Sequence, residues 1–149
     1  MNIEIRFPLA SEIKGLVELC KMHAAYEEAE FDENHQELRL TRDILSSTPK
    51  LYCLLAIRSD EIVGYATFMK QYSTWEAKEY IYMDCLYVKE FARGEGVGEL
   101  LVNEVKSHGQ SLGCSLIQWQ TPSFNKRAMK FYDRIGAYSK SKERYFLTL

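Results

Sequence analysis

A strand, a glycine-containing loop and an amphipathic helix follow one another between residues 80 and 112, and this order limits what the chain can fold into. Residues 80–88 (YIYMDCLYV) are rich in the aromatic and β-branched side chains that favour strands. From residue 97 onward, one helical face is lined by Val97, Leu101, Val105, His108 and Leu112. A strand that leads through a short loop into such a helix predicts a sheet with helices packed against it.

The loop, Arg93-Gly94-Glu95-Gly96-Val97-Gly98, has the composition of a phosphate-binding turn. Glycines at alternate positions let backbone N–H groups approach a ligand closely, and the following helix N-terminus adds about half a positive charge. The pattern R-x-x-G-x-G is neither the dinucleotide fingerprint nor a Walker A loop. The alternative is a purely structural turn whose glycines serve tight packing.

Other segments complete a mixed α/β (α+β) sheet in one domain. Further strands are expected at residues 3–7, 51–58, 62–69, 115–120 and 145–149, and further helices at 11–26, 36–47 and 125–135. We expect the strands at 80–88 and 115–120 to be parallel, because a helix connects them. No linker, repeat or low-complexity tract divides the 149 residues.

Composition argues against several classes of function. The chain has 19 Lys and Arg against 21 Asp and Glu, a net charge of −2, which argues against nucleic acid as a partner. No apolar run approaches the roughly 18 to 20 residues of a membrane helix, and charged residues interrupt the first twenty positions, so a soluble, cytoplasmic protein without a membrane partner is expected. Cys20, Cys53, Cys85 and Cys114 form no CxxC pair, which predicts free thiols and no metal site.

Two segments together resemble the GNAT family of N-acetyltransferases. The loop at 93–98 matches the family's [RQ]-x-x-G-x-[GA] pattern after the central strand, and residues 125–137 (NKRAMKFYDRIGA) match its N-x-x-A-x-x-F-Y-x-x-x-G-[FA] helix. The resemblance covers nearly the whole chain and is strongest to the diamine (spermidine/spermine) and thialysine acetyltransferases. It implies a GNAT domain over residues 1–149, with a mixed central sheet flanked by helices, that transfers the acetyl group of acetyl-CoA to a primary amine.

The resemblance also implies where acetyl-CoA binds. Backbone amides of the loop would hold the pyrophosphate, Asn125 the pantetheine arm, and a basic residue among Lys126, Arg127 and Lys130 the remaining phosphate. A backbone N–H near Leu86 or Tyr87 would stabilise the oxyanion. The expected cofactor-binding residues are Leu86, Tyr87, Val88, Arg93, Gly94, Glu95, Gly96, Val97, Gly98, Asn125 and Lys130.

The reaction requires an acid and a base. An alkyl amine with a pKa of about 10.4 is almost wholly protonated at neutral pH, so a group must accept its proton, and the departing thiolate must receive one. The resemblance implies Tyr132 as the acid; by periodicity alone, Tyr132 is part of an apolar helix face. Asp84 is the only carboxylate within strand 80–88, where burial among apolar side chains is costly without a task. We expect it to act as the base, directly or through water; the alternative is a carboxylate hydrogen-bonded near a bulge.

The acceptor amine is expected to meet carboxylates and aromatic rings. Residues 26–33 carry five carboxylates, and by resemblance the acceptor side comprises Tyr26, Glu27, Glu28, Trp75 and Asp84. Carboxylates attract a polyamine, and Trp75 would add a cation–π contact; a solvated acidic loop is the alternative. Ser73 and Cys85 stand where diamine-specific members carry carboxylates, so a lysine analogue, an aminoglycoside or a peptide N-terminus stays open as acceptor.

Two further alternatives concern the whole protein. A non-catalytic acyl-CoA sensor would keep the loop without turnover, and a protein acetyltransferase would need an open groove for a peptide. The final segment, residues 145–149 (YFLTL), is a candidate edge strand for pairing between two copies of the chain, so a homodimer is expected.

Overall fold

The computed structural model describes residues 2–149 as a single α+β domain built on one five-stranded sheet. The strands lie in the order β1 (Glu4–Arg6), β2 (Tyr52–Arg58), β3 (Glu61–Ser73), β4 (Lys78–Val88) and β5 (Ile117–Gln118). The first four are antiparallel, whereas β4 and β5 are parallel. The mixed sheet and the parallel arrangement of its last two strands are as the sequence predicts, although β5 is shorter than expected.

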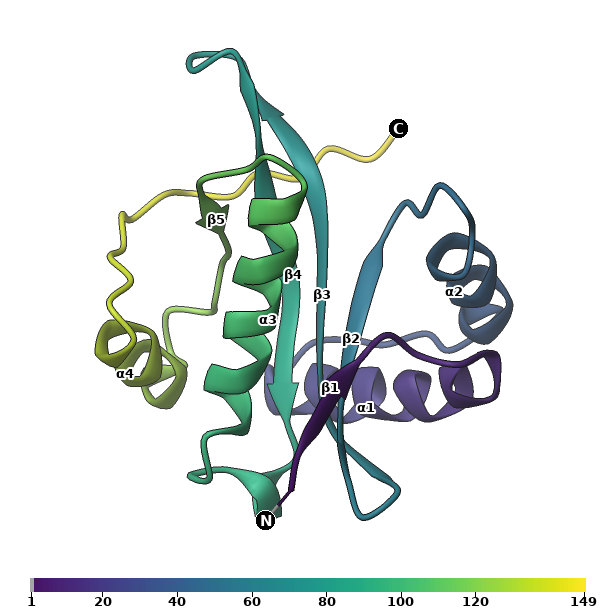
Figure 1. Ribbon diagram of the computed structural model, residues 1–149. Helices are drawn as coiled ribbons and strands as arrows, with labels where there is room; N and C mark the ends of the chain where they lie inside the picture. The colour runs from purple at the N-terminus through teal and green to yellow at the C-terminus, as the bar shows by residue number, and fades with distance from the viewer. Residues whose placement is uncertain (1) are drawn as a thin grey trace.

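Four helices surround the sheet: α1 (Ile13–Tyr26), α2 (Gln36–Ile44), α3 (Val97–Ser111) and α4 (Lys126–Arg134). Helix α4 lies beside the β5 end of the sheet (Figure 1). Two short 3-10 turns, η1 (Ala10–Glu12) and η2 (Glu90–Ala92), precede α1 and follow β4. These helices lie within a few residues of the predicted ranges.

Alternation along the strands divides the apolar side chains between two faces. On β2, Leu54 and Ala56 pack in a cluster with α3, while Cys53 and Leu55 pack in a second cluster with α1 and α2. The sheet therefore lies between α1 and α2 on one side and α3 on the other, and each helix turns its apolar face inward.

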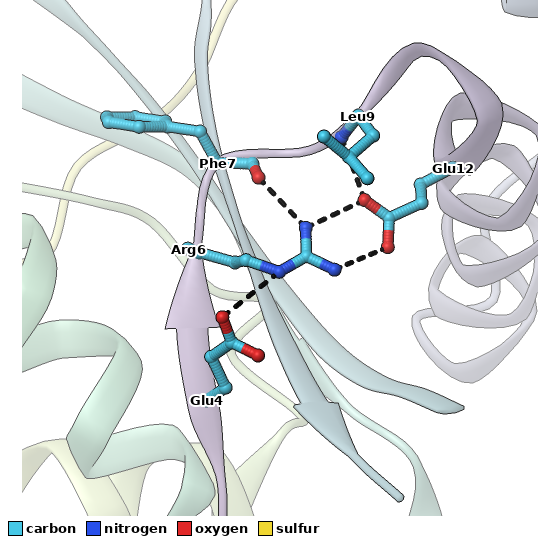
Figure 2. A network of polar contacts seen from close by, with 5 residues as sticks. All are labelled: Glu4, Arg6, Phe7, Leu9 and Glu12. Carbon is cyan, nitrogen blue, oxygen red and sulfur yellow. Dashed lines mark hydrogen bonds and ion pairs between the residues drawn. The ribbon is translucent and has the colours of Figure 1, made fainter. Parts of the chain in front are cut away.

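An arginine links β1 to the beginning of α1 (Figure 2). The Arg6 guanidinium donates two hydrogen bonds of 2.8 Å to the Glu12 carboxylate, and a third to the Phe7 carbonyl oxygen at 3.2 Å. The backbone N–H of Leu9 donates to Glu12 Oε1 at 2.8 Å. Glu12 thus anchors the chain as it leaves the sheet and enters α1.

Strand β4 separates from both neighbours near its middle. Thr67 of β3 faces Cys85, but the next residue, Phe68, faces Met83, so Asp84 has no partner and forms a bulge. On the other side, β4 pairs with β5 only at Ile81 and Tyr82. The second half of β4 therefore has a free edge beside β5, where a ligand has access.

The predicted strand at 145–149 is not formed: residues 137–149 adopt no helix or strand. An isolated strand has nothing to hydrogen-bond, and no strand within residues 2–149 pairs with this segment. Its side chains, including Tyr145, Phe146 and Leu147, are exposed. No helix between residues 2 and 149 is both long and apolar enough to cross a membrane.

Candidate active site

A cleft of about 480 Å³ opens beside the free half of β4. Its walls come from the end of α1, residues 86–88 of β4, the glycine loop, the first turn of α3 and one face of α4. The site is therefore assembled where a strand end, two helix N-terminal regions and a helix C-terminus meet.

The glycine loop adopts a conformation that glycine is suited to. Gly94 and Gly96 have φ values of 81° and 82°, and a Cβ atom added at either would meet no atom within 4 Å. Gly96 also caps the N-terminus of α3. The loop thus leaves open space next to a helix N-terminus, as a phosphate-binding turn requires.

Two side chains of the loop have partners within the protein. Arg93 Nε donates to the Val88 carbonyl oxygen at 2.8 Å, and the guanidinium lies 4.4 Å from the centre of the Tyr26 ring. Glu95 pairs with Arg58 and does not line the cleft. Arg93 therefore holds the loop to β4, whereas the structure does not bring Glu95, one of the predicted cofactor-binding residues, into the cleft.

Helix α4 contributes positive charge to the cleft. Arg127, Lys130 and Arg134 line it, whereas Lys126 does not. Of these, Arg134 lies outside the predicted set, although it follows Lys130 by four residues and Lys130 follows Arg127 by three, which places all three on one helical face. The cleft therefore has a cationic side suited to phosphate groups.

Asn125 is buried at the N-terminus of α4. Its Oδ1 accepts a hydrogen bond from the Ala128 N–H at 3.3 Å and one from the Tyr26 hydroxyl at 3.2 Å. The first bond caps α4 and the second joins α4 to the end of α1. Asn125 therefore also stabilises the fold, because its side-chain oxygen accepts hydrogen bonds from two other residues of the chain.

A second, smaller cavity of about 80 Å³ adjoins the cleft at the edge of β4. Asp84, Trp119 and Gln120 line the smaller cavity alone, while four residues line both: His23, Glu27, Leu86 and Tyr132. These shared residues mark the junction between the two cavities.

Tyr132 is held at this junction in its protonated form. Its ring packs edge-on against Trp119, with centroids 5.2 Å apart. Burial, with the charge of Glu27 and the nearby Tyr26 adding to it, raises the pKa of Tyr132 to about 12. At neutral pH this phenol therefore keeps its proton.

Asp84 is not buried among apolar side chains, contrary to the expectation for an unbroken strand. The bulge displaces it from the alternating pattern, and its side chain is exposed toward the smaller cavity. Its nearest polar partner is the Cys85 thiol, at 3.8 Å from Oδ2. The carboxylate is therefore open to a ligand in the smaller cavity.

Two predicted acceptor residues lie outside the site. Trp75 is 99% exposed in the turn between β3 and β4 and lines neither cavity. The long β3–β4 hairpin carries it to the opposite end of β4 from the glycine loop (Figure 1). Glu28, exposed just beyond α1, also lines neither cavity.

His23 is a site residue that sequence analysis missed. It lines both cavities, stacks on Tyr87 with ring centroids 5.0 Å apart, and makes a 2.7 Å contact with Glu27. The one signal in the sequence was its position four residues before Glu27, which places the two side chains on one face of α1. Within the described residues, no group of three His, Cys, Asp or Glu side chains is arranged to hold a metal ion.

Comparison with known proteins agrees with this architecture. Residues 16–137 match the model of the Acetyltransferase (GNAT) family. The thialysine N-epsilon-acetyltransferase of Bos taurus is 29% identical over 143 residues, covering 91% of this chain and 84% of the relative. A D-amino-acid N-acetyltransferase of Saccharomyces cerevisiae is 34% identical over 103 residues, covering 68% and 63%.

The fold also matches a solved structure. An aminoglycoside N-acetyltransferase in complex with CoA superposes with a TM-score of 0.83 at 15% identity, covering 99% of this chain and 95% of that one. At that identity only the fold is shared, but the family match rests on most of the sequence. This chain therefore belongs to the Acetyltransferase (GNAT) family and is an acetyl-CoA-dependent N-acetyltransferase.

Proposed function

We propose that the protein acetylates a primary amine of a small cationic molecule, such as a polyamine or a lysine analogue, with Tyr132 as the general acid. One observation carries this proposal: Tyr132 and Glu27 line both cavities, at the point where the larger one meets the smaller. A thioester held in the large cleft would meet an amine in the small one at this junction.

The large cleft has the features that acetyl-CoA requires. Open space at Gly94 and Gly96 beside the α3 N-terminus suits the pyrophosphate, and Arg127, Lys130 and Arg134 suit the remaining phosphate. The amide NH₂ of Asn125, which donates no hydrogen bond within residues 2–149, is left for the pantetheine arm. We assign Leu86, Tyr87 and Val88 to the acyl end of the cofactor.

The smaller cavity has the character of an amine site. Glu27 and Asp84 supply carboxylates, Trp119 supplies an aromatic face, and no Lys or Arg side chain of residues 2–149 lines it. The two carboxylates attract a cationic amine, and among residues 2–149 no Lys or Arg in the lining opposes its binding. The relatives named for thialysine and D-amino acids act on amines of small molecules by their names, which supports an acceptor of that size.

The residues divide the proton transfers between them. Acetyl-CoA supplies an acetyl group activated as a thioester. Asp84, directly or through water, accepts the proton that the ammonium group must lose before its nitrogen can attack. Tyr132 donates its hydroxyl proton to the departing sulfur, and its raised pKa keeps that proton available at neutral pH.

A thiol-release assay tests the proposal. The protein is incubated with acetyl-CoA and, in separate reactions, with polyamines, thialysine and other lysine analogues, aminoglycosides, or short peptides. We expect amine-dependent release of CoA thiol with the first two groups. Release with peptides alone would contradict a small-molecule acceptor.

We also propose that two copies associate through the C-terminal segment and that the protein works in the cytoplasm. The exposed apolar side chains at residues 145–147 support the first proposal, because association would remove them from water. The four cysteines, all free, support the second, because thiols persist in a reducing compartment.

A further inference from the structure

A histidine connects the buried sheet to the acceptor cavity. His23 Nδ1 lies 2.8 Å from the Tyr65 hydroxyl, and Nε2 lies 2.7 Å from Glu27 Oε2. Stacking on Tyr87 and an edge-on contact with Tyr65 hold the imidazole plane. The ring therefore has one orientation, with one nitrogen toward the core and the other toward Glu27.

The direction of these hydrogen bonds follows from Glu27, because a carboxylate oxygen can only accept, so His23 Nε2 donates. Tyr65 is only 1% exposed, and burial raises the pKa of its phenol, so its hydroxyl keeps its proton and can donate to Nδ1. A neutral imidazole that accepts at Nδ1 carries its own proton on Nε2. His23 then donates that proton's hydrogen bond to Glu27.

Glu27 needs such a partner. Glu27 is the C-cap residue of α1, where the helix dipole disfavours a negative charge. Its side chain is 30% exposed, so without a hydrogen-bond partner it would be free to adopt several rotamers. The bond from His23 occupies Oε2, while Oε1 accepts no hydrogen bond from any residue between 2 and 149. One oxygen is thus fixed and the other is left for a ligand in the cavities.

We propose that His23 is a positioning residue that, held by Tyr65, fixes the Glu27 carboxylate so that Oε1 binds the ammonium group of the acceptor. This inference rests on the proposed function, because it assumes an amine in the smaller cavity. It adds a hydrogen-bonded chain, Tyr65–His23–Glu27, that determines acceptor affinity without His23 touching the reacting atoms.

Substitutions at His23 separate positioning from packing. Leucine removes both hydrogen bonds, whereas the amide nitrogen of glutamine can still donate to Glu27. We expect His23→Leu to raise the KM for spermidine about tenfold, the value of one hydrogen bond to a charged group, with an unchanged KM for acetyl-CoA. His23→Gln should recover most of that loss.

A double-mutant cycle shows whether the effect passes through Glu27. In a Glu27→Gln background, His23→Leu should weaken spermidine affinity no further. An additive loss in the double variant, or a wild-type KM for spermidine in His23→Leu, would overturn the inference. Circular dichroism and the KM for acetyl-CoA show that each variant is folded.

A measurement without turnover keeps this inference distinct from the proposed function. Calorimetric titration of spermidine in the absence of acetyl-CoA should show weaker binding to His23→Leu than to the wild type. Absence of thiol release alone would contradict the proposed function, whereas equal spermidine Kd values, or no binding to the wild type, would contradict the role of His23.

Discussion

Tyr132 keeps its proton because α4 places its hydroxyl in a half-buried junction near the carboxylate of Glu27, where a phenolate would be both poorly solvated and repelled. Asp84, by contrast, is exposed to solvent by a bulge. Two ionisable groups at the edge of one small cavity therefore have opposite surroundings, one partly buried and one exposed, as the proposed acid and base require.

Tyr132→Phe tests the acid. Removal of the hydroxyl should lower kcat by roughly 10- to 10⁴-fold, with little change in the KM for acetyl-CoA. Because the pKa of Tyr132 is raised to about 12, the wild type should not lose its acid between pH 7 and 10. Thiol release measured across this range checks both expectations. Full activity in the variant would exclude Tyr132 as the acid.

Glu12→Gln tests the link between β1 and α1. Hydrogen bonds from Arg6 lower the pKa of Glu12 below its ordinary value, so the carboxylate stabilises the fold above its unfolded pKa of about 4.3, and this contribution is lost as the pH falls through the folded pKa. We expect the variant to lose about 1 kcal/mol at pH 7, or roughly 2–4 °C in Tm. Thermal melts should converge with the wild type near pH 3; a constant difference would contradict the pairing.

At the scale of elements, the end of β4 and the beginning of α3 form the proposed cofactor site, and the loop that connects them depends on glycine. Gly94 and Gly96 adopt positive φ, and Gly98 allows α3 to approach α4, since a Cβ there would lie 3.3 Å from the Phe131 ring. The loop therefore combines an open surface for the ligand with close packing behind it.

Gly96→Val tests the loop, with Gly113→Val as its matched control. The two glycines have φ values of 82° and 83°, and a Cβ atom added at either would meet no atom within 4 Å, but only Gly96 lines the cleft. A β-branched residue should strain both sites by about 1–3 kcal/mol. Only Gly96→Val should raise the KM for acetyl-CoA; an equal KM in the two variants would contradict a phosphate site at the loop.

At the scale of the whole molecule, β5 pairs with β4 only at Ile81 and Tyr82, and the smaller cavity lies at the edge of β4 beyond this pairing. The chain that follows α4 runs on without a strand partner (Figure 1). A segment of exposed aromatic and aliphatic side chains is costly to leave in water. The proposed dimer would cover this segment and supply the hydrogen-bond partners that it lacks.

Deletion of residues 145–149 tests this association. Light scattering should report a dimer for the full chain and a monomer for the truncated one. Trp75→Ser, which removes an equally exposed aromatic side chain at the far hairpin, should leave the dimer intact. A monomeric full chain at micromolar concentration would contradict the proposal.

Much of the fold could be predicted because its signals are local. Three of these signals each lie within a few residues of sequence: the aromatic and β-branched residues at 80–88, the glycines at 94 and 96, and the apolar periodicity of α3. The glycine loop that they predict lines the large cleft. The motif at residues 125–137, whose spacing is equally local, predicted Asn125 and Tyr132 as site residues, and both line the large cleft.

Local sequence by itself determined the strand, the phosphate-type turn and the helices, because backbone propensity and side-chain periodicity act over short distances. Only the tertiary structure decided that the bulge exposes Asp84, that the hairpin carries Trp75 away, and that His23 lies between Tyr65 and Glu27. These outcomes depend on strand register and on contacts between residues far apart in the chain, and neither can be predicted from a local sequence pattern.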